Sequence, residues 1–350
     1  MKNLQFAVLG TGYWSNLQIP AWLEVGGVDI VAVYNRTVSK AEKIAKKYNI
    51  AKIYSDPEEM LKQEDLDFID IIAQVPAHAP FVFLAAKYKV PVICQKPMAE
   101  DYSTCRSMVL SCKKAGIPFF IHENFRWQPP MQSVKEALKA GHIGKPFRAN
   151  IQLYNFGYDN FNFDEQPFLK TLDHYALTDI GSHLFDLARF FFGEPHSIYC
   201  QTYKTVEYVG GEDVVSAILR INDVICHCEI TNRCNTTIYI EGTKGVIELD
   251  TNSNLHIETD QESIVKDCNT LSPHYSWVSP EDEKINGAAM IHSIIACNKH
   301  LLNALRTGNP PETTGEDNLK TMRLMFSAID SADTNKVIHL DEDQFDFLRS

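Results

Sequence analysis

Six short apolar runs alternate with helical segments over the first 122 residues, and this alternation limits the fold more than any other feature of the chain. The runs are nearly continuously apolar, as strands are when helices cover both faces of their sheet. Strand–helix alternation of this kind predicts a doubly wound parallel sheet. The expected strands are Leu4–Leu9, Ile30–Tyr34, Ile53–Tyr54, Phe68–Ile72, Val90–Cys94 and Pro118–Ile121.

The rest of the chain has a different pattern. Residues 198–249 contain several strand-like runs joined by short turns, which predict hairpins of an open, mostly antiparallel sheet. Residues 259–287 are polar with few apolar anchors, and we expect them to form a loop. We therefore predict an α/β protein with a parallel-sheet domain over residues 1–122 and an α+β domain over residues 123–350.

Composition excludes several classes of protein. The 350 residues carry a formal net charge of -12 without a Lys/Arg block, which argues against nucleic-acid and anionic-membrane partners. The 9 cysteines are scattered, odd in number and lack a CxxC spacing, so neither a disulfide framework nor a metal site is expected. The N-terminus runs straight into a strand and no long apolar span follows, so we expect a cytoplasmic protein.

A glycine-rich turn follows the first expected strand. Its sequence is Gly10-Thr11-Gly12-Tyr13-Trp14-Ser15, and a helix is expected after it. Glycines between a strand and a helix allow a pyrophosphate to approach the backbone and rest on the helix N-terminus. The third glycine of the full dinucleotide fingerprint is replaced by Ser15. We therefore predict that a cofactor contacts Gly10, Gly12, Tyr13 and Trp14. The alternative is a tight turn that binds no ligand.

The second expected strand ends in Asn35, Arg36 and Thr37, where a dinucleotide site usually has an acid for the adenosine ribose. A carboxylate there would repel a 2′-phosphate, whereas Arg36 could pair with one. We therefore predict that Asn35, Arg36 and Thr37 contact the cofactor and that they favour NADP over NAD. An Arg36 that stacks on adenine with NAD bound, or that is simply solvated, fits the same residues.

The fifth expected strand delivers a lysine to a turn. Gln95, Lys96 and Pro97 follow Val90–Cys94, and the proline keeps Lys96 out of a helix. Ligands of open α/β sheets bind outside the carboxyl ends of the strands, so Lys96 would face the dinucleotide side. The alternative is an ordinary solvated lysine.

Two stretches in the second half carry polar groups among apolar ones. Asp179 and His183 lie four residues apart in an expected helix that ends at Gly193, so they would share a face. A carboxylate beside an imidazole orients a general base, although such a pair is more often structural. Tyr154–Phe163 alternates aromatic residues with amides, as a sugar site or a subunit interface would.

These segments resemble the Gfo/Idh/MocA oxidoreductases from end to end. The family's Glu-Lys-Pro signature corresponds to Gln95-Lys96-Pro97, its Asn-x-Arg-aromatic-x-Pro segment to Asn124–Pro129, and its Asp-x-Gly-x-His helix to Asp179–His183. The late Thr314-Gly315-Glu316-Asp317 helix start is also typical. The last feature and His122–Pro129 resemble D-apiose-type sugar dehydrogenases within the family.

The resemblance implies an N-terminal Rossmann domain, an NAD(P) cofactor and a sugar or polyol substrate. It implies that Lys96 hydrogen-bonds the reacting oxygen, that His183 takes the hydroxyl proton, and that Asp179 orients the imidazole or contacts substrate. Further cofactor contacts are expected at Pro76, His78, Gln95 and Lys96, and substrate contacts at Lys96, Asn124, Arg126, Trp127, Asp179 and His183. Gln95 stands where the family has an acid, and the loop at Val75–His78 departs from the family's Thr-Pro-Asn form.

The expected reaction is hydride transfer between nicotinamide and a secondary alcohol or ketone, in a homodimer or homotetramer formed through the C-terminal sheet. A catalytically inactive, dinucleotide-sensing regulator on the same fold is the rival, and a hydrolase that uses its cofactor transiently is a third candidate.

Overall fold

The structure is a computed structural model that describes residues 2–154 and 166–340. The chain forms two compact units: the first contains the residues up to 123 together with 294–322, and the second contains 124–293 and the chain from 323 onward. Most of the predicted Tyr154–Phe163 run lies outside the described residues. None of the described helices has the length and apolar character that crossing a membrane requires.

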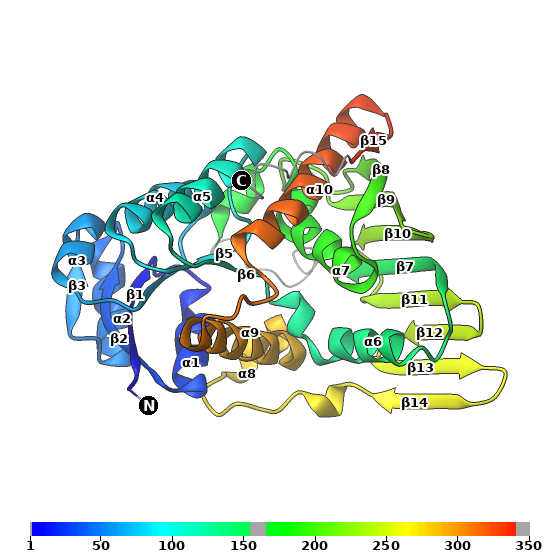
Figure 1. The fold of residues 1–350 in the computed structure, drawn as a ribbon, viewed down its shortest axis with the longest axis horizontal. Helices are drawn as coiled ribbons and strands as arrows, with labels where there is room; N and C mark the ends of the chain where they lie inside the picture. Colours follow the sequence, from blue (N-terminus) through cyan, green and yellow to red (C-terminus); the bar gives the residue numbers. More distant parts are fainter. Residues whose placement is uncertain (1, 155–165, 341–350) are drawn as a thin grey trace. The chain divides into compact units, whose positions relative to one another are not determined.

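The first unit is built on a six-stranded sheet with the order β3-β2-β1-β4-β5-β6, in which every neighbouring pair is parallel. This confirms the predicted doubly wound sheet. Helices α4 and α5 pack against each other above the sheet in Figure 1, and α1 lies below it. The elements are β1 (Leu4–Leu9), α1 (Ser15–Val25), β2 (Val28–Tyr34), α2 (Val38–Tyr48), β3 (Lys52–Tyr54), α3 (Pro57–Gln63), β4 (Phe68–Ile71), α4 (His78–Tyr88), β5 (Val92–Gln95), α5 (Tyr102–Ala115) and β6 (Phe119–His122).

Residues 294–322, predicted to belong to the second domain, instead complete the first unit. Hydrogen bonds return this segment to the edge of the sheet: the Ile121 N–H donates to the Thr313 carbonyl at 2.9 Å. The Arg306 guanidinium also donates to the Gly27 carbonyl at 2.8 Å. Pairings this distant along the chain leave no local sequence pattern, so the sequence did not predict that residues 294–322 return to the first unit.

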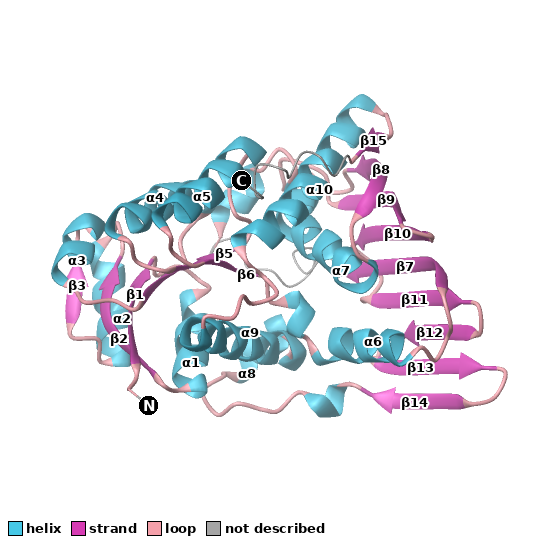
Figure 2. Cartoon of the chain, viewed as in Figure 1, coloured by secondary structure: helices cyan, strands magenta, loops and turns pink. Residues whose placement is uncertain are grey.

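The second unit is built on a nine-stranded sheet with the order β14-β13-β12-β11-β7-β10-β9-β8-β15. Only the β7–β10 pair is parallel, so the sheet is mostly antiparallel, as predicted. Helices α6 and α7 both pack on one face of it (Figure 2). The elements are α6 (Pro129–Ala140), β7 (Pro146–Tyr154), α7 (Ser182–Phe192), β8 (Pro195–Tyr203), β9 (Val214–Ile221), β10 (Val224–Thr231), β11 (Thr237–Gly242), β12 (Gly245–Leu249), β13 (Asn254–Thr259), β14 (Ser263–Asp267), α8 (Pro280–Asn286), α9 (Ala288–Thr307), α10 (Gly315–Thr334) and β15 (Ile338–His339).

The prediction of a loop over residues 259–287 was wrong, because strand β14 and helix α8 lie within it. Strand β14 is the edge of the sheet, and its residues alternate between exposed and half-buried without a buried face. Such a strand lacks the apolar period by which strands are recognised. Helix α8 is a short helix capped by Ser279, whose hydroxyl accepts the Asp282 N–H at 3.0 Å.

The core of the first unit contains one carboxyl group in the middle of an apolar strand. Asp70, on β4, is fully buried between the sheet and α1. The Gln18 side-chain nitrogen lies 2.9 Å from each carboxylate oxygen, and the Trp22 indole nitrogen lies 2.7 Å from Oδ2. Burial raises the pKa of Asp70 to about 7, although both donors oppose that shift by stabilising the carboxylate.

We expect Asp70→Asn to change how stability depends on pH. The carboxyl ionises near 3.8 in the unfolded chain and near 7 in the folded one, so between these values the folded state binds the extra proton. The free energy of unfolding of the wild type therefore falls as pH rises through that window. Asparagine cannot titrate, so across the same window the free energy of unfolding of Asp70→Asn should rise relative to wild type by up to about 4 kcal/mol. Urea unfolding at several pH values measures the difference. A difference in unfolding free energy that stays constant across the window would contradict this assignment.

Candidate active site

The glycine-rich turn after β1 has the shape that a dinucleotide diphosphate needs. Gly10 has a φ of +103°, and a Cβ added there would lie 2.6 Å from the Ile72 carbonyl oxygen, so glycine is required. A Cβ added at Gly12 would meet nothing within 4 Å, which leaves its backbone open to a ligand. The Thr11 hydroxyl is buried and has no hydrogen-bond partner among the described residues. An open backbone beside a buried, unsatisfied hydroxyl at the start of α1 fits a bound phosphate.

Two predicted aromatic cofactor contacts lie in the same turn. Tyr13 and Trp14 are half-buried, and their rings meet edge to face with centroids 5.9 Å apart. They form the last turn before α1 begins at Ser15, whose hydroxyl donates to the Gly12 carbonyl at 2.7 Å.

Asn35 holds the glycine-rich turn to the end of β2. Its side-chain oxygen accepts the Thr11 N–H at 3.1 Å, and its side-chain nitrogen donates to the Thr37 carbonyl at 3.0 Å. Arg36 and Thr37 are exposed beside it. The Asn35 amide therefore uses its oxygen and its nitrogen for backbone hydrogen bonds, and the Arg36 side chain is exposed at the surface of the turn.

The loop after β4 gives its predicted cofactor residues different surroundings. Pro76 is exposed in a 3₁₀ turn, Val75–Ala77. His78 was predicted to contact the cofactor, but its ring is fully buried, with Nε2 3.0 Å from the Ala73 carbonyl and Nδ1 3.1 Å from the Pro97 carbonyl. Burial lowers the pKa of His78 more than these carbonyls raise it. The imidazole thus ties together the loops that follow β4 and β5, and its contact with the cofactor stays a prediction.

Lys96 lies where the sequence predicts it, directly after β5 and at the carboxyl edge of the sheet. The residue is half-buried, and the Lys96–Pro97 peptide bond is cis. Its backbone N–H donates to the side-chain oxygen of Gln95 at 3.2 Å. Gln95, a predicted cofactor contact, is buried and turns its amide toward Gln18 and His122. Its side chain therefore links the Lys96 backbone to buried side chains of the core.

In the second unit, the predicted substrate residues Asn124 and Arg126 hold a 3₁₀ turn, Phe125–Trp127, in place. The Asn124 amide donates to the Ser293 hydroxyl at 2.6 Å. The Arg126 guanidinium, 7% exposed, makes a bidentate pair with the fully buried Asp186 at 2.6 and 2.7 Å. These two side chains thus hold the turn in position, and their contact with a substrate stays a prediction.

The same turn positions His183. Phe125 stacks on the imidazole with ring centroids 3.6 Å apart and planes 9° apart, and both rings are buried. His183 and Asp186 are both on α7, three residues apart, so the stacking and the Arg126 ion pair act on the same face of that helix. Trp127, also a predicted substrate contact, is half-buried at the end of the turn.

Asp179 is not in the regular helix that the sequence predicts. Leu177–Gly181 is a π-helical turn, and α7 begins after it at Ser182. Single π turns within helices occur frequently at functional sites. Asp179 is half-buried, and its charge adds to burial in raising the pKa of the Tyr175 hydroxyl. Tyr175 is buried one helical turn before Asp179, and the sequence analysis missed it.

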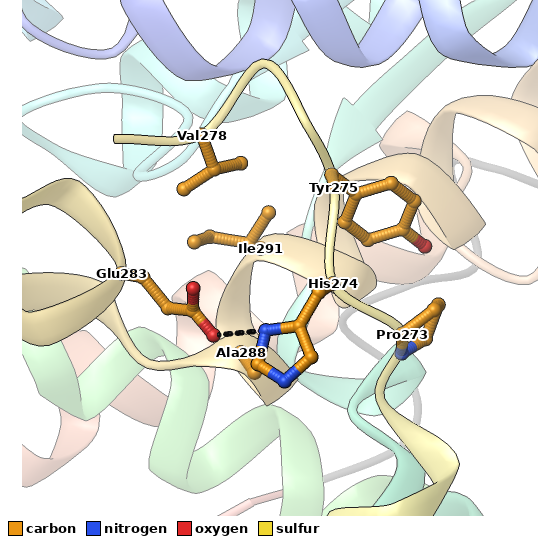
Figure 3. A pocket seen from close by; sticks show the side chains of 7 residues that line it. All are labelled: Pro273, His274, Tyr275, Val278, Glu283, Ala288 and Ile291. Atoms are coloured by element: carbon orange, nitrogen blue, oxygen red, sulfur yellow. Dashed lines mark ion pairs between the residues drawn. The ribbon is translucent and has the colours of Figure 1, made fainter. Parts of the chain in front are cut away.

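Neither a metal site nor a separate ligand pocket accounts for these residues. In residues 2–154 and 166–340, no group of three or more His, Cys, Asp or Glu side chains is arranged to hold a metal ion. Figure 3 shows a small hollow lined by residues 273–275, 278, 283, 288 and 291, across which His274 pairs with Glu283 at 2.8 Å. No residue predicted to contact cofactor or substrate lines it.

Comparisons with known proteins agree with this geometry. Residues 4–122 match the oxidoreductase family with an NAD-binding Rossmann fold, and residues 131–248 match the Gfo/Idh/MocA C-terminal domain. The chain is 31% identical to a D-apiose dehydrogenase of Paraburkholderia graminis, over 97% of this chain and 90% of that one. It is 32% identical to a D-apiose dehydrogenase of Rhizobium rhizogenes, over 97% and 98%.

A solved structure supports the same conclusion. The crystal structure of an oxidoreductase from Agrobacterium radiobacter in complex with NAD+, L-tartaric acid and magnesium matches with a TM-score of 0.89. The two chains are 31% identical, and the match covers 97% of this chain and 98% of that one. The protein therefore belongs to the Gfo/Idh/MocA family of oxidoreductases.

Proposed function

We propose that the protein is an NAD(P)-dependent dehydrogenase acting on a secondary alcohol of a sugar or polyol. The observation that carries the proposal is Lys96 at the carboxyl end of β5, in a domain whose glycine-rich turn fits a diphosphate. The nearly full-length likeness to two D-apiose dehydrogenases supports a sugar as substrate. The rival of an inactive regulator finds no support among these relatives.

In the proposed reaction, side chains of this protein stabilise developing charge and transfer a proton. A bound nicotinamide supplies the hydride acceptor or donor. Lys96 donates a hydrogen bond to the reacting oxygen and stabilises the negative charge that develops there. His183, its ring plane fixed by Phe125, takes the hydroxyl proton in oxidation and returns it in reduction. Asp179 orients the imidazole or contacts the substrate.

We expect Lys96→Met and His183→Ala each to lower turnover by about 100-fold or more, because each removes a group that acts on the transition state. NADH affinity should change much less, since most cofactor contacts remain. Oxidation of D-apiose and a panel of other sugars and polyols with NAD+ and NADP+ measures turnover. Lys46→Met and His142→Ala make the same changes elsewhere and should keep wild-type rates.

Two results would count against these roles. Near wild-type turnover in both variants would remove Lys96 and His183 from the mechanism. Wild-type protein that binds NADH but oxidises no member of the panel would remove the sugar or polyol substrate.

The turn after β2 supports NADP as the cofactor. The Asn35 side chain is occupied by Thr11 and Thr37 and adds no negative charge where an adenosine ribose would bind. The exposed Arg36 beside it can pair with a 2′-phosphate.

We expect Asn35→Asp to weaken NADPH binding by about tenfold or more and to change NADH binding little. A carboxylate still accepts the Thr11 N–H but repels a 2′-phosphate, and a charged hydrogen bond of this kind is worth about a tenfold change in affinity. Arg36→Ala should weaken NADPH in the same way. Fluorescence titrations with NADH and NADPH measure both, and a wild-type protein that prefers NADH would refute the assignment.

The uncovered face of the nine-stranded sheet supports association into a homodimer or homotetramer. Ile225, 43% exposed, lies opposite Arg148 on one side and Arg220 on the other. Ile218, also 43% exposed, lies opposite His227. A sheet face that carries exposed apolar side chains among charged ones is suited to a second copy of itself.

We expect Ile218→Glu combined with Ile225→Glu to reduce the mass in solution to that of one 39.7 kDa chain. Burying two carboxylates at a self-complementary interface costs more than the contacts return. Light scattering after gel filtration measures the mass. Phe83→Glu, at an exposed apolar position in the first unit, should leave it unchanged. An unchanged mass in the double variant would contradict association through this face.

The cysteines support a cytoplasmic location. All nine are free thiols, and all except Cys234 are buried, as expected of a protein that stays in a reducing compartment.

A further inference from the structure

A chain of buried side-chain amides runs from Asp70 to the backbone of Lys96. Gln18, on α1, donates to Asp70 and accepts from the Gln95 amide nitrogen. The Gln95 oxygen accepts the Lys96 N–H at 3.2 Å. Asp70 and Gln18 are fully buried and Gln95 is 8% exposed, so water cannot replace a bond that is lost.

The carboxylate at one end fixes the orientation of every amide along this chain. When Asp70 is ionised it only accepts hydrogen bonds, so in that state Gln18 must turn its NH₂ group toward Asp70 and its oxygen toward Gln95. Gln95 must then turn its own NH₂ group toward Gln18. Only the Gln95 oxygen remains to hold Lys96.

A side branch fixes the same orientation. The Gln95 amide nitrogen also lies 3.3 Å from Nδ1 of His122, which is fully buried on β6. As the acceptor of that bond, Nδ1 carries no proton, so the proton is on Nε2. Nε2 lies 2.9 Å from the side-chain oxygen of Asn298.

We propose that Gln95 is a positioning residue for Lys96, and that its amide is held in the working orientation by the Asp70–Gln18 pair. The proposal rests on the function proposed above for Lys96. On this proposal Gln95 acts on catalysis through the Lys96 backbone and does not contact the substrate.

The polarity of the chain makes a sharp test possible. Gln95→Glu keeps the size of the side chain but turns an oxygen toward the Gln18 oxygen, which sets acceptor against acceptor. Asp70→Asn alone sets donor against donor at the other end. In the double variant every bond along this chain can reverse, and the His122 branch follows if the imidazole proton moves from Nε2 to Nδ1 and the Asn298 amide turns to donate to Nε2. The new amide at position 70 donates to Gln18, and Gln18 donates to the new carboxylate at position 95. An oxygen of that carboxylate still accepts the Lys96 N–H.

The experiment compares wild type, the two single variants and the double variant by two measurements. Hydrogen exchange at the Lys96 amide, read by fragmentation mass spectrometry, reports the hydrogen bond without any substrate. Turnover on the sugar that wild type oxidises, with NADH affinity measured alongside, reports the consequence. Gln261→Glu, on an exposed turn, is the matched control for the chemical change.

We expect Gln95→Glu to exchange the Lys96 amide about tenfold faster and to lower turnover by about tenfold, with NADH affinity nearly unchanged. The double variant should recover both values to within about threefold of wild type. Wild-type exchange and turnover in Gln95→Glu, or a folded double variant no better than the single ones, would overturn the proposal. If Lys96→Met keeps full turnover, the proposed role of Lys96 fails, while the exchange measurement still tests the amide chain.

Discussion

The buried carboxylate of Asp70 is the interaction on which the carboxyl edge of the first sheet depends. It accepts from two side chains of α1, and α1 is the helix whose N-terminus would receive the diphosphate. Through Gln18 and Gln95 it also reaches Lys96. This one carboxyl group is therefore bonded both to α1 and, through two amides, to the backbone of Lys96. Its raised pKa reflects the energetic cost of keeping that charge away from water.

In the second unit, a buried ion pair holds a predicted site residue in position. The bidentate pair between Arg126 and Asp186 holds the 3₁₀ turn against α7, and Phe125 from that turn covers one face of His183. Removing one partner of such a pair costs about 3–5 kcal/mol, because the other charge stays buried. The segment that resembles the family motif thus fixes the position of the His183 ring, the proposed base.

The sequence was sufficient for the order of elements in the first sheet, because buried parallel strands are short apolar runs between helices. It was also sufficient for Gly10, whose positive φ and contact with Ile72 admit no other residue. It was not sufficient for Asp70: a single acid in an apolar strand was the available signal, but its partners lie 48 and 52 residues away. The sequence also did not predict edge strand β14 or the return of residues 294–322 to the first unit. Pairing at a sheet edge or between distant segments leaves no periodic pattern of apolar residues in the local sequence.

Two departures from the expected pattern have a common physical basis. Asn35 and Gln95 are both amides at positions where an acid was expected, and each side-chain oxygen accepts a backbone N–H, from Thr11 and from Lys96. An amide oxygen makes that bond as a carboxylate would, but it adds no negative charge at the carboxyl edge of the sheet. A chain with a net charge of -12 gains from this, because the expected ligand carries two or more phosphate charges of the same sign. Asp70 keeps its carboxylate in the core, where its hydrogen bonds to α1 offset part of the cost of burying a charge.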